Sequence, residues 1–442
     1  MLFDIIITIK VVVVMTRKER RNLRKDKNLI RNLYSIIEKY LPELFNKFST
    51  LTDIRNQSYV NYDMKVICVT RLFGLLCGLT SLSTISGDEF NTDDCINNIS
   101  TICKTKLNEL PYWETIQDVF VNLKIDELRD MQKYIVKALI RSKMFDKYKY
   151  DGAFQLIFDG TGLSNHDYNL NGNCLQRKHK DGKISYYKYV LECKLCVGNI
   201  VISLDSDFIE NTKMLNDKQK QDCEIKAFKR MIKRIKKNYP KQKFIISGDG
   251  LYATTPIIKL CNKNKWFYIF NLKPDRLKDI NSSFEGNILL KNETTAKNYY
   301  LSTGIEFNGN ILNVFKYIEK KNKKETIFRY ISNINVTDDT IKDIVKLGRN
   351  RWKIENEGFY TQKHRTFNIT HLSSRNDNAM KTHYFFIQFA HVIRQLLEQG
   401  DIHTKSLLLK LKEVSAYLIK SLTSPNPNLM KIDINFQLRF DT

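Results

Sequence analysis

The apolar residues change their spacing near residue 153, and this change limits the folds open to the chain more than any other feature. From residue 16 to about 147 they recur at i, i+3, i+4 and i+7, as in NLIRNLYSIIEKYLPELFNKF and ELRDMQKYIVKALIRSKMF. This spacing predicts amphipathic helices. Short apolar runs follow, and AFQLIFDGTG is the first of them. The chain therefore begins with a helical region and continues into a part built on strands.

Beyond residue 153, predicted strands alternate with helices. ISYYKYVLECKLCVG and NIVISLDSDFIEN predict antiparallel strands around a VGN turn, and a helix is expected at about 219–238. KFIISGDG and WFYIFNL predict two more strands, and TTPIIKLCNKN between them predicts a helix with proline in its first turn. Residues 275–336 contain short apolar runs and turn signals, which indicate extra strands, and helices resume at about 338. This order predicts an α/β fold, with a mixed sheet flanked by helices and interrupted by a β-rich insertion.

The same pattern divides the 442 residues into stretches. We expect 1–15 to be a leader or a mis-assigned start, because MLFDIIITIKVVVVM is too short to span a membrane and precedes its basic cluster. The other expected stretches, in chain order, are a helical, DNA-binding region at 16–150, the first part of a catalytic core at 151–274, the β-rich insertion at 275–337, the end of the core at 338–400 and a C-terminal helical tail at 401–442.

Basic residues strongly outnumber acidic ones. The chain has 72 lysines and arginines against 48 acids, a formal net charge of +24. Such an excess predicts attraction to polyanions, above all nucleic acid. A general lysine-rich bias is the alternative, because asparagine and isoleucine are abundant too. The segment RKERRNLRKDK is accordingly interpreted either as a DNA contact or as a solvated helix face.

Cysteine and histidine give little sign of a metal or redox centre. The nine cysteines are scattered singly, which fits a reducing cytoplasm. Cys193 and Cys196 form a CxxC on a predicted strand, where residues three apart point to opposite faces. The seven histidines form no HExxH motif, and Cys174 with His179 lacks a second ligand pair. The chain also has no Walker or dinucleotide glycine motif, which argues against a nucleotide cofactor.

Three acids occupy related places in the predicted fold. Asp159 ends the first strand in IFDGTG, Asp249 ends a later strand in ISGDGLY, and Glu355 lies on the helix after the insertion. Functional side chains gather at strand ends in α/β sheets. Converging carboxylates repel each other unless a cation joins them, and oxygen-rich sites suit Mg²⁺ or Mn²⁺. We therefore expect these acids to bind two such ions for phosphodiester chemistry. Asp205 and Asp207, on a hairpin strand, are expected to be structural or peripheral.

The stretch RNRWKIENEGFYTQKHR, residues 349–365, is predicted to be one regular helix. At about 100° per residue, one third of its circumference collects a mixed set of side chains. These are Arg351, Trp352, Glu355, Phe359, Gln362 and Lys363. Trp352 and Phe359 would then seat the helix on the sheet, while Arg351 and Lys363 would hold phosphate. An intrahelical Arg351–Glu355 pair is the alternative.

These motifs resemble those of DDE transposases of bacterial insertion sequences. The chain is similar to the branch with an RNase H-like core, a β-strand insertion and a Y-x2-R-x3-E-x6-K signature around the last acid. FDGTG matches the first-Asp motif and SGDGLYA the second, while Arg351 and Glu355 match the signature's Arg and Glu. Gly348 replaces its Tyr, and Gln362 holds its Lys position, with Lys363 one residue later. The resemblance covers roughly residues 150–400.

The resemblance implies a metal-dependent DNA-cutting and joining enzyme. Asp159, Asp249 and Glu355 would be the catalytic and metal-binding residues, with Arg351 and Lys363 on phosphate. The partners would be DNA, as terminal inverted repeats and target, and a second copy of the chain in a synaptic homodimer. The protein would act in the bacterial cytoplasm on nucleoid DNA, without membrane or nucleotide cofactor. An RNase H-like nuclease that cuts without joining, or a non-catalytic DNA-binding relic, are the alternatives.

Overall fold

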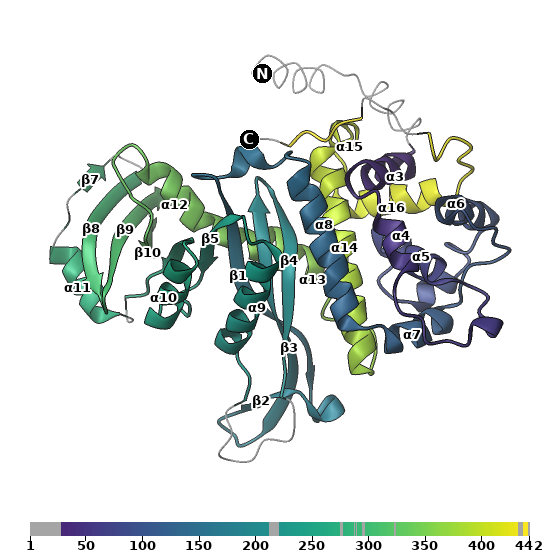
Figure 1. Ribbon diagram of the computed structural model, residues 1–442, viewed down its shortest axis with the longest axis horizontal. Helices are drawn as coiled ribbons and strands as arrows, with labels where there is room; N and C mark the ends of the chain where they lie inside the picture. Colours follow the sequence, from purple (N-terminus) through teal and green to yellow (C-terminus); the bar gives the residue numbers. More distant parts are fainter. Residues whose placement is uncertain are drawn as a thin grey trace. The chain divides into compact units, whose positions relative to one another are not determined.

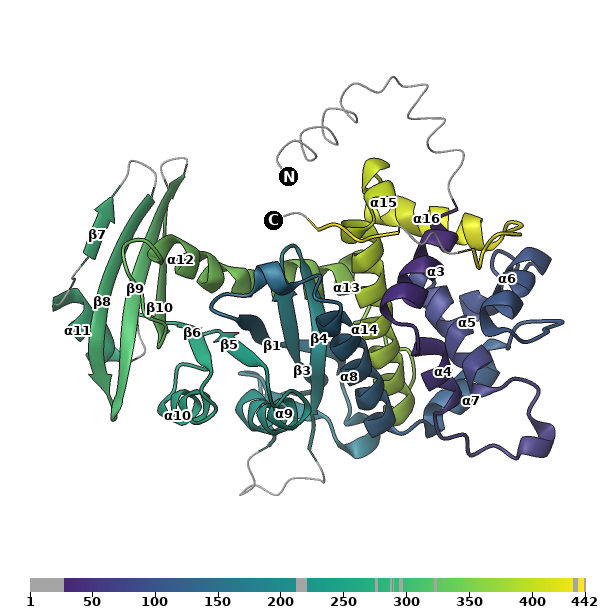
Figure 2. The same cartoon turned by 45° about the horizontal axis from the view of Figure 1, so that its top comes forward.

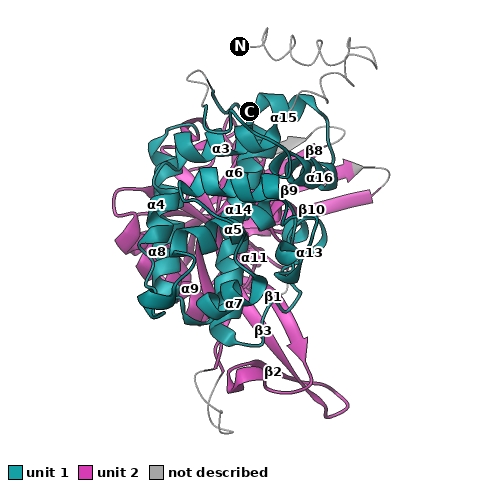
Figure 3. Ribbon diagram, turned by 90° about the vertical axis from the view of Figure 1, so that its right-hand side faces the viewer, with its two compact units in different colours: residues 1–144, 360–442 teal, residues 145–359 magenta. Residues whose placement is uncertain are grey.

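The chain separates into two compact units, which are described one at a time. The computed structural model describes residues 28–211, 221–274, 277–286, 288, 290–293, 297–321, 324–431 and 436–440. Unit 1 consists of Met1–Met144 and Tyr360–Thr442, and unit 2 of Phe145–Phe359 (Figure 3). The expected leader at 1–15 and the basic segment at 17–27 lie outside the described residues.

Unit 1 is helical, as the apolar spacing predicted. Its helices in the described ranges are α3 (Leu29–Tyr40), α4 (Leu44–Ser49), α5 (Met64–Leu76), α6 (Asp93–Cys103), α7 (Trp113–Asn122), α8 (Ile125–Arg141), α13 (Thr361–His364), α14 (Asp377–Gly400), α15 (Ile402–Ser406) and α16 (Leu411–Leu422). Asn376 caps α14 by accepting a hydrogen bond from the Ala379 amide. Helix α14 is buried along nearly its whole length against α3, α5, α7 and α8, so it forms the centre of the unit (Figure 1).

Unit 2 is built on a 10-stranded mixed sheet of described residues. Its strands are β1 (Ala153–His166), β2 (Leu175–Lys178), β3 (Ile184–Val197), β4 (Ile200–Ile209), β5 (Lys243–Gly248), β6 (Phe267–Asn271), β7 (Leu290–Glu293), β8 (Lys297–Phe307), β9 (Asn310–Lys321) and β10 (Lys324–Ser332). Their order is β2-β3-β1-β5-β6-β10-β9-β8-β7, and β4 also pairs with β3. Strands β1, β5 and β6 are parallel, whereas β3 is antiparallel to β1. The predicted mixed α/β, RNase H-like arrangement with a β-rich insertion is confirmed.

The insertion continues the sheet of the core. Strand β10 pairs antiparallel with β6, with Ile331 opposite Phe270. Strands β9, β8 and β7 follow outward as antiparallel neighbours. Helix α11 (Lys278–Gly286) lies in the same region and contacts β8. The stretch predicted as extra strands is therefore an extension of one sheet with a short helix beside it.

Helices cover both faces of the sheet because side chains alternate along each strand. Ala153 of β1 packs in one cluster with Ile341 and Ile344 of α12 (Ile341–Arg349). On the other face, the Phe158 ring lies 4.7 Å from the ring of Phe228 on α9 (Glu224–Asn238). Figure 2 shows α9 and α10 (Thr255–Lys263) along one face and α12 along the other.

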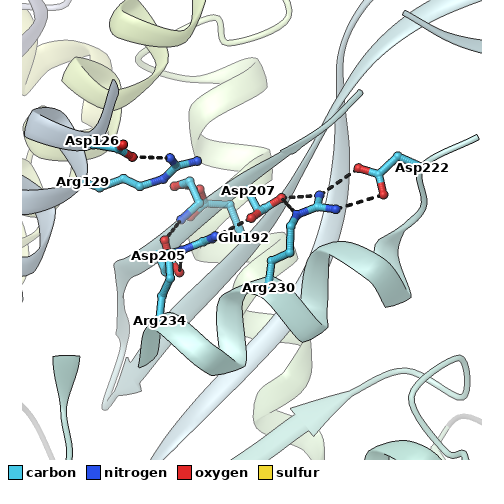
Figure 4. A network of polar contacts seen from close by, with 9 residues as sticks. Asp126, Arg129, Glu192, Asp205, Asp207, Asp222, Arg230 and Arg234 are labelled. Atoms are coloured by element: carbon cyan, nitrogen blue, oxygen red, sulfur yellow. Dashed lines mark hydrogen bonds and ion pairs between the residues drawn. The ribbon is translucent and has the colours of Figure 1, made fainter. Parts of the chain in front are cut away.

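Buried charges fix α9 on β4 (Figure 4). Arg234 bonds Asp205 at 2.9 Å and Asp207 at 2.7 Å, and Arg230 bonds both Asp207 and Asp222. The two aspartates are almost inaccessible, so the arginines neutralise carboxylates that would otherwise be buried as lone charges. These contacts agree with the structural role that the sequence predicted for Asp205 and Asp207.

The two cysteines of the CxxC lie on opposite faces of β3. Cys196 packs with Ile157 and Phe359, whereas Cys193 stands opposite Asp205, on the face that α9 covers. All cysteines in the described ranges are free thiols. No described helix is both long enough and apolar enough to cross a membrane.

Candidate active site

Asp159 on β1 and Asp249 just after β5 lie at corresponding positions of two neighbouring chain segments. In the parallel register of β1 and β5, Ile157 pairs with Ser247. Asp159 lies two residues after Ile157, and Asp249 lies two residues after Ser247. Asp249 follows the end of β5, and its Oδ1 accepts the Leu251 amide at 2.8 Å. The structure therefore brings together two of the three predicted acids.

The prediction that Asp159 ends its strand is wrong. Strand β1 continues to His166, because β3 keeps pairing with it after β5 has ended. Asp159 itself pairs with Glu192 of β3. The residue still lies two positions past the last β1–β5 pair, at Ile157, so its side chain stands at the margin of the parallel part of the sheet.

Burial is the main influence on the Asp159 carboxyl, and two other carboxylates lie near it. Burial raises the pKa of Asp159 to about 6 against the opposing influence of Arg351, and the Glu224 and Asp249 carboxylates add to the rise. A carboxyl group with such a pKa gains from a nearby positive charge. The Asp159–Asp249 pair therefore has the oxygen chemistry and the unmet charge that suit a hard divalent cation.

Arg351 is the cation that the chain itself places at this pair. Its Nη1 lies 3.6 Å from Asp159 Oδ2, and the residue is 8 % exposed. The guanidinium also stacks on the Trp352 ring, 4.6 Å from its centroid. Arg351 thus pairs with Asp159 across the sheet surface, a contact that neither sequence interpretation included.

The segment that carries Glu355 is not one regular helix. Helix α12 ends at Arg349, a 3₁₀ turn covers Asn350–Trp352, and a π-helix covers Ile354–Tyr360. A π-helix has more residues per turn than an α-helix, so a projection at about 100° per residue does not apply there. The predicted face is therefore wrong in part.

One of the two predicted anchors seats this segment on the sheet, and the other does not. Phe359 does pack on the sheet, as expected, together with Ile354, against Ile157 and Cys196. Trp352, the other expected anchor, is 45 % exposed. Glu355 is exposed in the first turn of the π-helix. Short π-helical turns inside helices often accompany functional sites, because they shift side chains out of the regular spacing.

The fit of the three acids to a metal is incomplete in this conformation. Among the described residues, no group of three or more His, Cys, Asp or Glu side chains is close enough to hold a metal ion. Asp159 and Asp249 supply a suitable pair, whereas Glu355 lies four residues after Arg351, which occupies the position against Asp159. The donor chemistry suits Mg²⁺ or Mn²⁺, and the third carboxylate is not assembled with the first two.

Gln362 belongs to the core of unit 1. It is fully buried, and its Nε2 lies 2.8 Å from Gln388 Oε1 and 3.0 Å from His391 Nδ1, both on α14. The side chain at the signature's Lys position therefore anchors α13 on α14. Lys363, the next residue, is partly exposed on α13.

Sequence reasoning missed Glu224, the first residue of α9. Tyr189 and Tyr252 donate hydrogen bonds to its two carboxylate oxygens at 3.0 Å and 3.3 Å. Burial, followed by the charge of Asp249, raises the pKa of Glu224, while the tyrosine hydrogen bonds lower it. The helix predicted at about 219–238 put Glu224 in its second turn, whereas α9 begins at Glu224. An acid near a helix start is common, because acids favour helix N-termini.

Comparison with known families accounts for these motifs. A family model described as Transposase DDE domain matches residues 155–393, more than half of the chain. The matched range includes Asp159, Asp249 and Glu355. No curated protein matched the chain in the corresponding search. Because the match spans the sheet, the insertion and the π-helical segment, the chain belongs to the transposase DDE domain family.

Proposed function

We propose that this protein is a DNA transposase that cuts at the ends of a mobile element and joins them to target DNA. The observation that carries the proposal is the side-by-side placement of Asp159 and Asp249 at the margin of the β1–β5 pairing, inside a matched DDE domain. The net charge of +24 supports a polyanionic substrate, whose affinity would fall steeply with salt.

Asp159, Asp249 and Glu355 would hold two divalent ions, Mg²⁺ or Mn²⁺. When bound, such ions activate the attacking oxygen and stabilise the leaving oxygen in phosphodiester chemistry. Asp159 lies on β1 and Asp249 directly follows β5, so the pairing of these two strands positions the backbone of both acids. Glu355 would join them by a local rearrangement of its exposed side chain and π-helical turn.

Arg351 would contact the DNA backbone next to the acids. Its guanidinium is held between Asp159 and Trp352, so little freedom is lost when it forms a bidentate contact to a phosphate. Lys363 would supply a second phosphate contact. Terminal inverted repeats and target DNA would be bound by a homodimer, with one subunit at each end. The protein would act in a reducing cytoplasm, with which the free thiols agree.

A cleavage and joining assay tests this function. DNA carrying the termini that flank the element would be incubated with the full chain and Mg²⁺, comparing wild type with Glu355→Gln and Asp159→Asn. Glu306→Gln is a matched control, because Glu306 is an exposed acid on β8 of the same unit. We expect cut and joined products with wild type and the control, and loss of both with the other two variants.

Three outcomes would contradict all or part of the proposal. Cutting without joined products would support the RNase H-like nuclease instead. DNA binding without any metal-dependent cleavage would support the non-catalytic relic. Normal activity in Asp159→Asn would remove Asp159 from the site altogether.

A further inference from the structure

A carboxylate outside the predicted triad lies beside the Asp159–Asp249 pair. Glu224 Oε1 accepts a hydrogen bond from the Tyr189 hydroxyl at 3.0 Å, and Oε2 accepts one from the Tyr252 hydroxyl at 3.3 Å. Tyr189 belongs to β3, which pairs with the strand of Asp159, and the Tyr252 amide donates to the Asp249 carbonyl at 3.1 Å. Glu224 thus links the two chain segments that carry the aspartates.

Two glycines make this link possible. Gly160 follows Asp159, and a Cβ placed on it would lie 2.4 Å from Tyr189 Cε1 and 2.8 Å from Glu224 Oε1. Gly248 precedes Asp249, and a Cβ there would lie 2.5 Å from Tyr252 Cδ2. Such approaches are far inside van der Waals contact. Each aspartate therefore has a neighbouring glycine whose missing side chain admits one of the two tyrosines.

The position of Glu224 is fixed by the two tyrosines at its carboxylate and by the packing of the rest of α9. Phe228, one turn along α9, packs against the rings of both Phe158 and Tyr252, at 4.7 Å and 5.2 Å. Further along, Arg230 and Arg234 bind α9 to β4 (Figure 4). Its carboxylate is consequently held near two other acids, an arrangement that like-charge repulsion opposes.

We propose that Glu224 is a positioning residue for the metal-binding acids. Through Tyr189 and Tyr252 it fixes Asp159 and Asp249 relative to each other, and its negative charge increases their attraction for divalent cations. In this role Glu224 acts through the two tyrosines that donate to its carboxylate, and the ion is held by the aspartates. This inference rests on the proposed function, since it assigns a role to Glu224 in the same metal-dependent site.

The test measures Mn²⁺ binding to the full chain by electron paramagnetic resonance, without DNA. The variants are Glu224→Gln, which removes the charge, and the double variant Tyr189→Phe/Tyr252→Phe, which keeps the charge and removes both hydrogen bonds. Glu306→Gln is the control for loss of one acid elsewhere in the unit. Substitution of groups that orient metal-binding residues typically lowers metal affinity by about 10- to 100-fold. We expect a loss of at least about tenfold for Glu224→Gln, a smaller loss for the double variant, and no change for the control.

Cleavage at increasing Mn²⁺ concentration separates positioning from general damage. If Glu224 is a positioning residue, Glu224→Gln should regain most of its cleavage rate at saturating Mn²⁺, whereas Asp159→Asn should not. Wild-type Mn²⁺ affinity in Glu224→Gln and in the double variant would overturn the inference while leaving the proposed function intact. If Glu224→Gln fails to fold, the double variant decides by the same criterion. A wild-type chain that neither binds Mn²⁺ nor cuts DNA would overturn both.

Discussion

The Gln362 side chain faces His391 of α14 in the buried centre of unit 1, with 3.0 Å between Gln362 Nε2 and His391 Nδ1. The position at which the family signature has a lysine is therefore used for packing in this chain. The Gln362 amide contacts Gln388 and His391 of α14, and neither of these two partners is a carboxylate.

Restoring the signature lysine should consequently destabilise the protein. Gln362→Lys would bury an ammonium group beside Gln388 and His391, at a cost of about 3 kcal/mol or more in the free energy of unfolding. Lys363→Gln, on the partly exposed neighbour, should cost less than about 1 kcal/mol. Urea unfolding followed by circular dichroism measures both. Equal stability of Gln362→Lys and wild type would show that the site can accept the charge.

Arg351 should not be replaceable by lysine. A lysine keeps the charge near Asp159 but lacks the planar fork that stacks on Trp352 and can hold a phosphate at two points. We expect Arg351→Lys to lower the cleavage rate at least about tenfold while the protein remains folded. Single-turnover cleavage under saturating Mg²⁺ gives the rate, and Trp352→Ala serves as the comparison that removes only the stacking. A rate for Arg351→Lys like that of wild type would rule out the bidentate contact.

Gly160 and Gly162 give a matched pair of substitutions on one strand. A Cβ on Gly160 would lie 2.4 Å from the Tyr189 ring, whereas the nearest atom to a Cβ on Gly162 is 4.0 Å away. Gly160→Ala should therefore displace Tyr189 and weaken Mn²⁺ binding, and Gly162→Ala should leave it unchanged. The same resonance titration measures both variants. Equal affinities would mean that Tyr189 can move aside without affecting Asp159.

The stability of unit 1 should depend on pH through His383. Burial holds the pKa of His383 well below its ordinary value of 6.5, and the charge of Arg71 lowers it further. The unfolded chain takes up a proton near pH 6.5 that the folded chain does not accept, so stability is lost as the pH falls below that value. The expected slope is about 1.4 kcal/mol per pH unit until the folded pKa is reached.

Urea unfolding at pH 7, 6 and 5 tests this slope. His383→Gln should remove most of it, because glutamine does not titrate. His371→Gln should leave it as in wild type, since His371 is exposed. A slope unchanged by His383→Gln would assign the effect to other groups.

Local sequence patterns were sufficient for the mixed sheet and for two neighbouring acids. The run before Asp159 and the run before Asp249 are both apolar, and parallel neighbours bring their ends to one level. The end of β1 could not be predicted, because it depends on pairing with β3 and not on the residues of β1 alone. The π-helix at Glu355 was missed for a related reason, since a projection assumes the α-helical period in advance.

Glu224 shows a different limit of local patterns. Its partners Tyr189 and Tyr252 lie 35 and 28 residues away along the chain, on a strand and in a loop. No window of the sequence contains all three. The sequence held only their consequence, the glycines next to the two aspartates.

The pairing of β10 with β6 has a consequence for how this protein can change over evolution. Ala153 and Ile245 of the core share a hydrophobic cluster with Phe315 and Tyr330 of the insertion, and α12 packs on all of them. Excising the insertion would expose the edge of β6 and strip α12 of part of its support, just before the segment that carries Arg351 and Glu355. The insertion therefore cannot be lost as a separate module without loss of core packing. Shortened natural variants should retain at least β9 and β10.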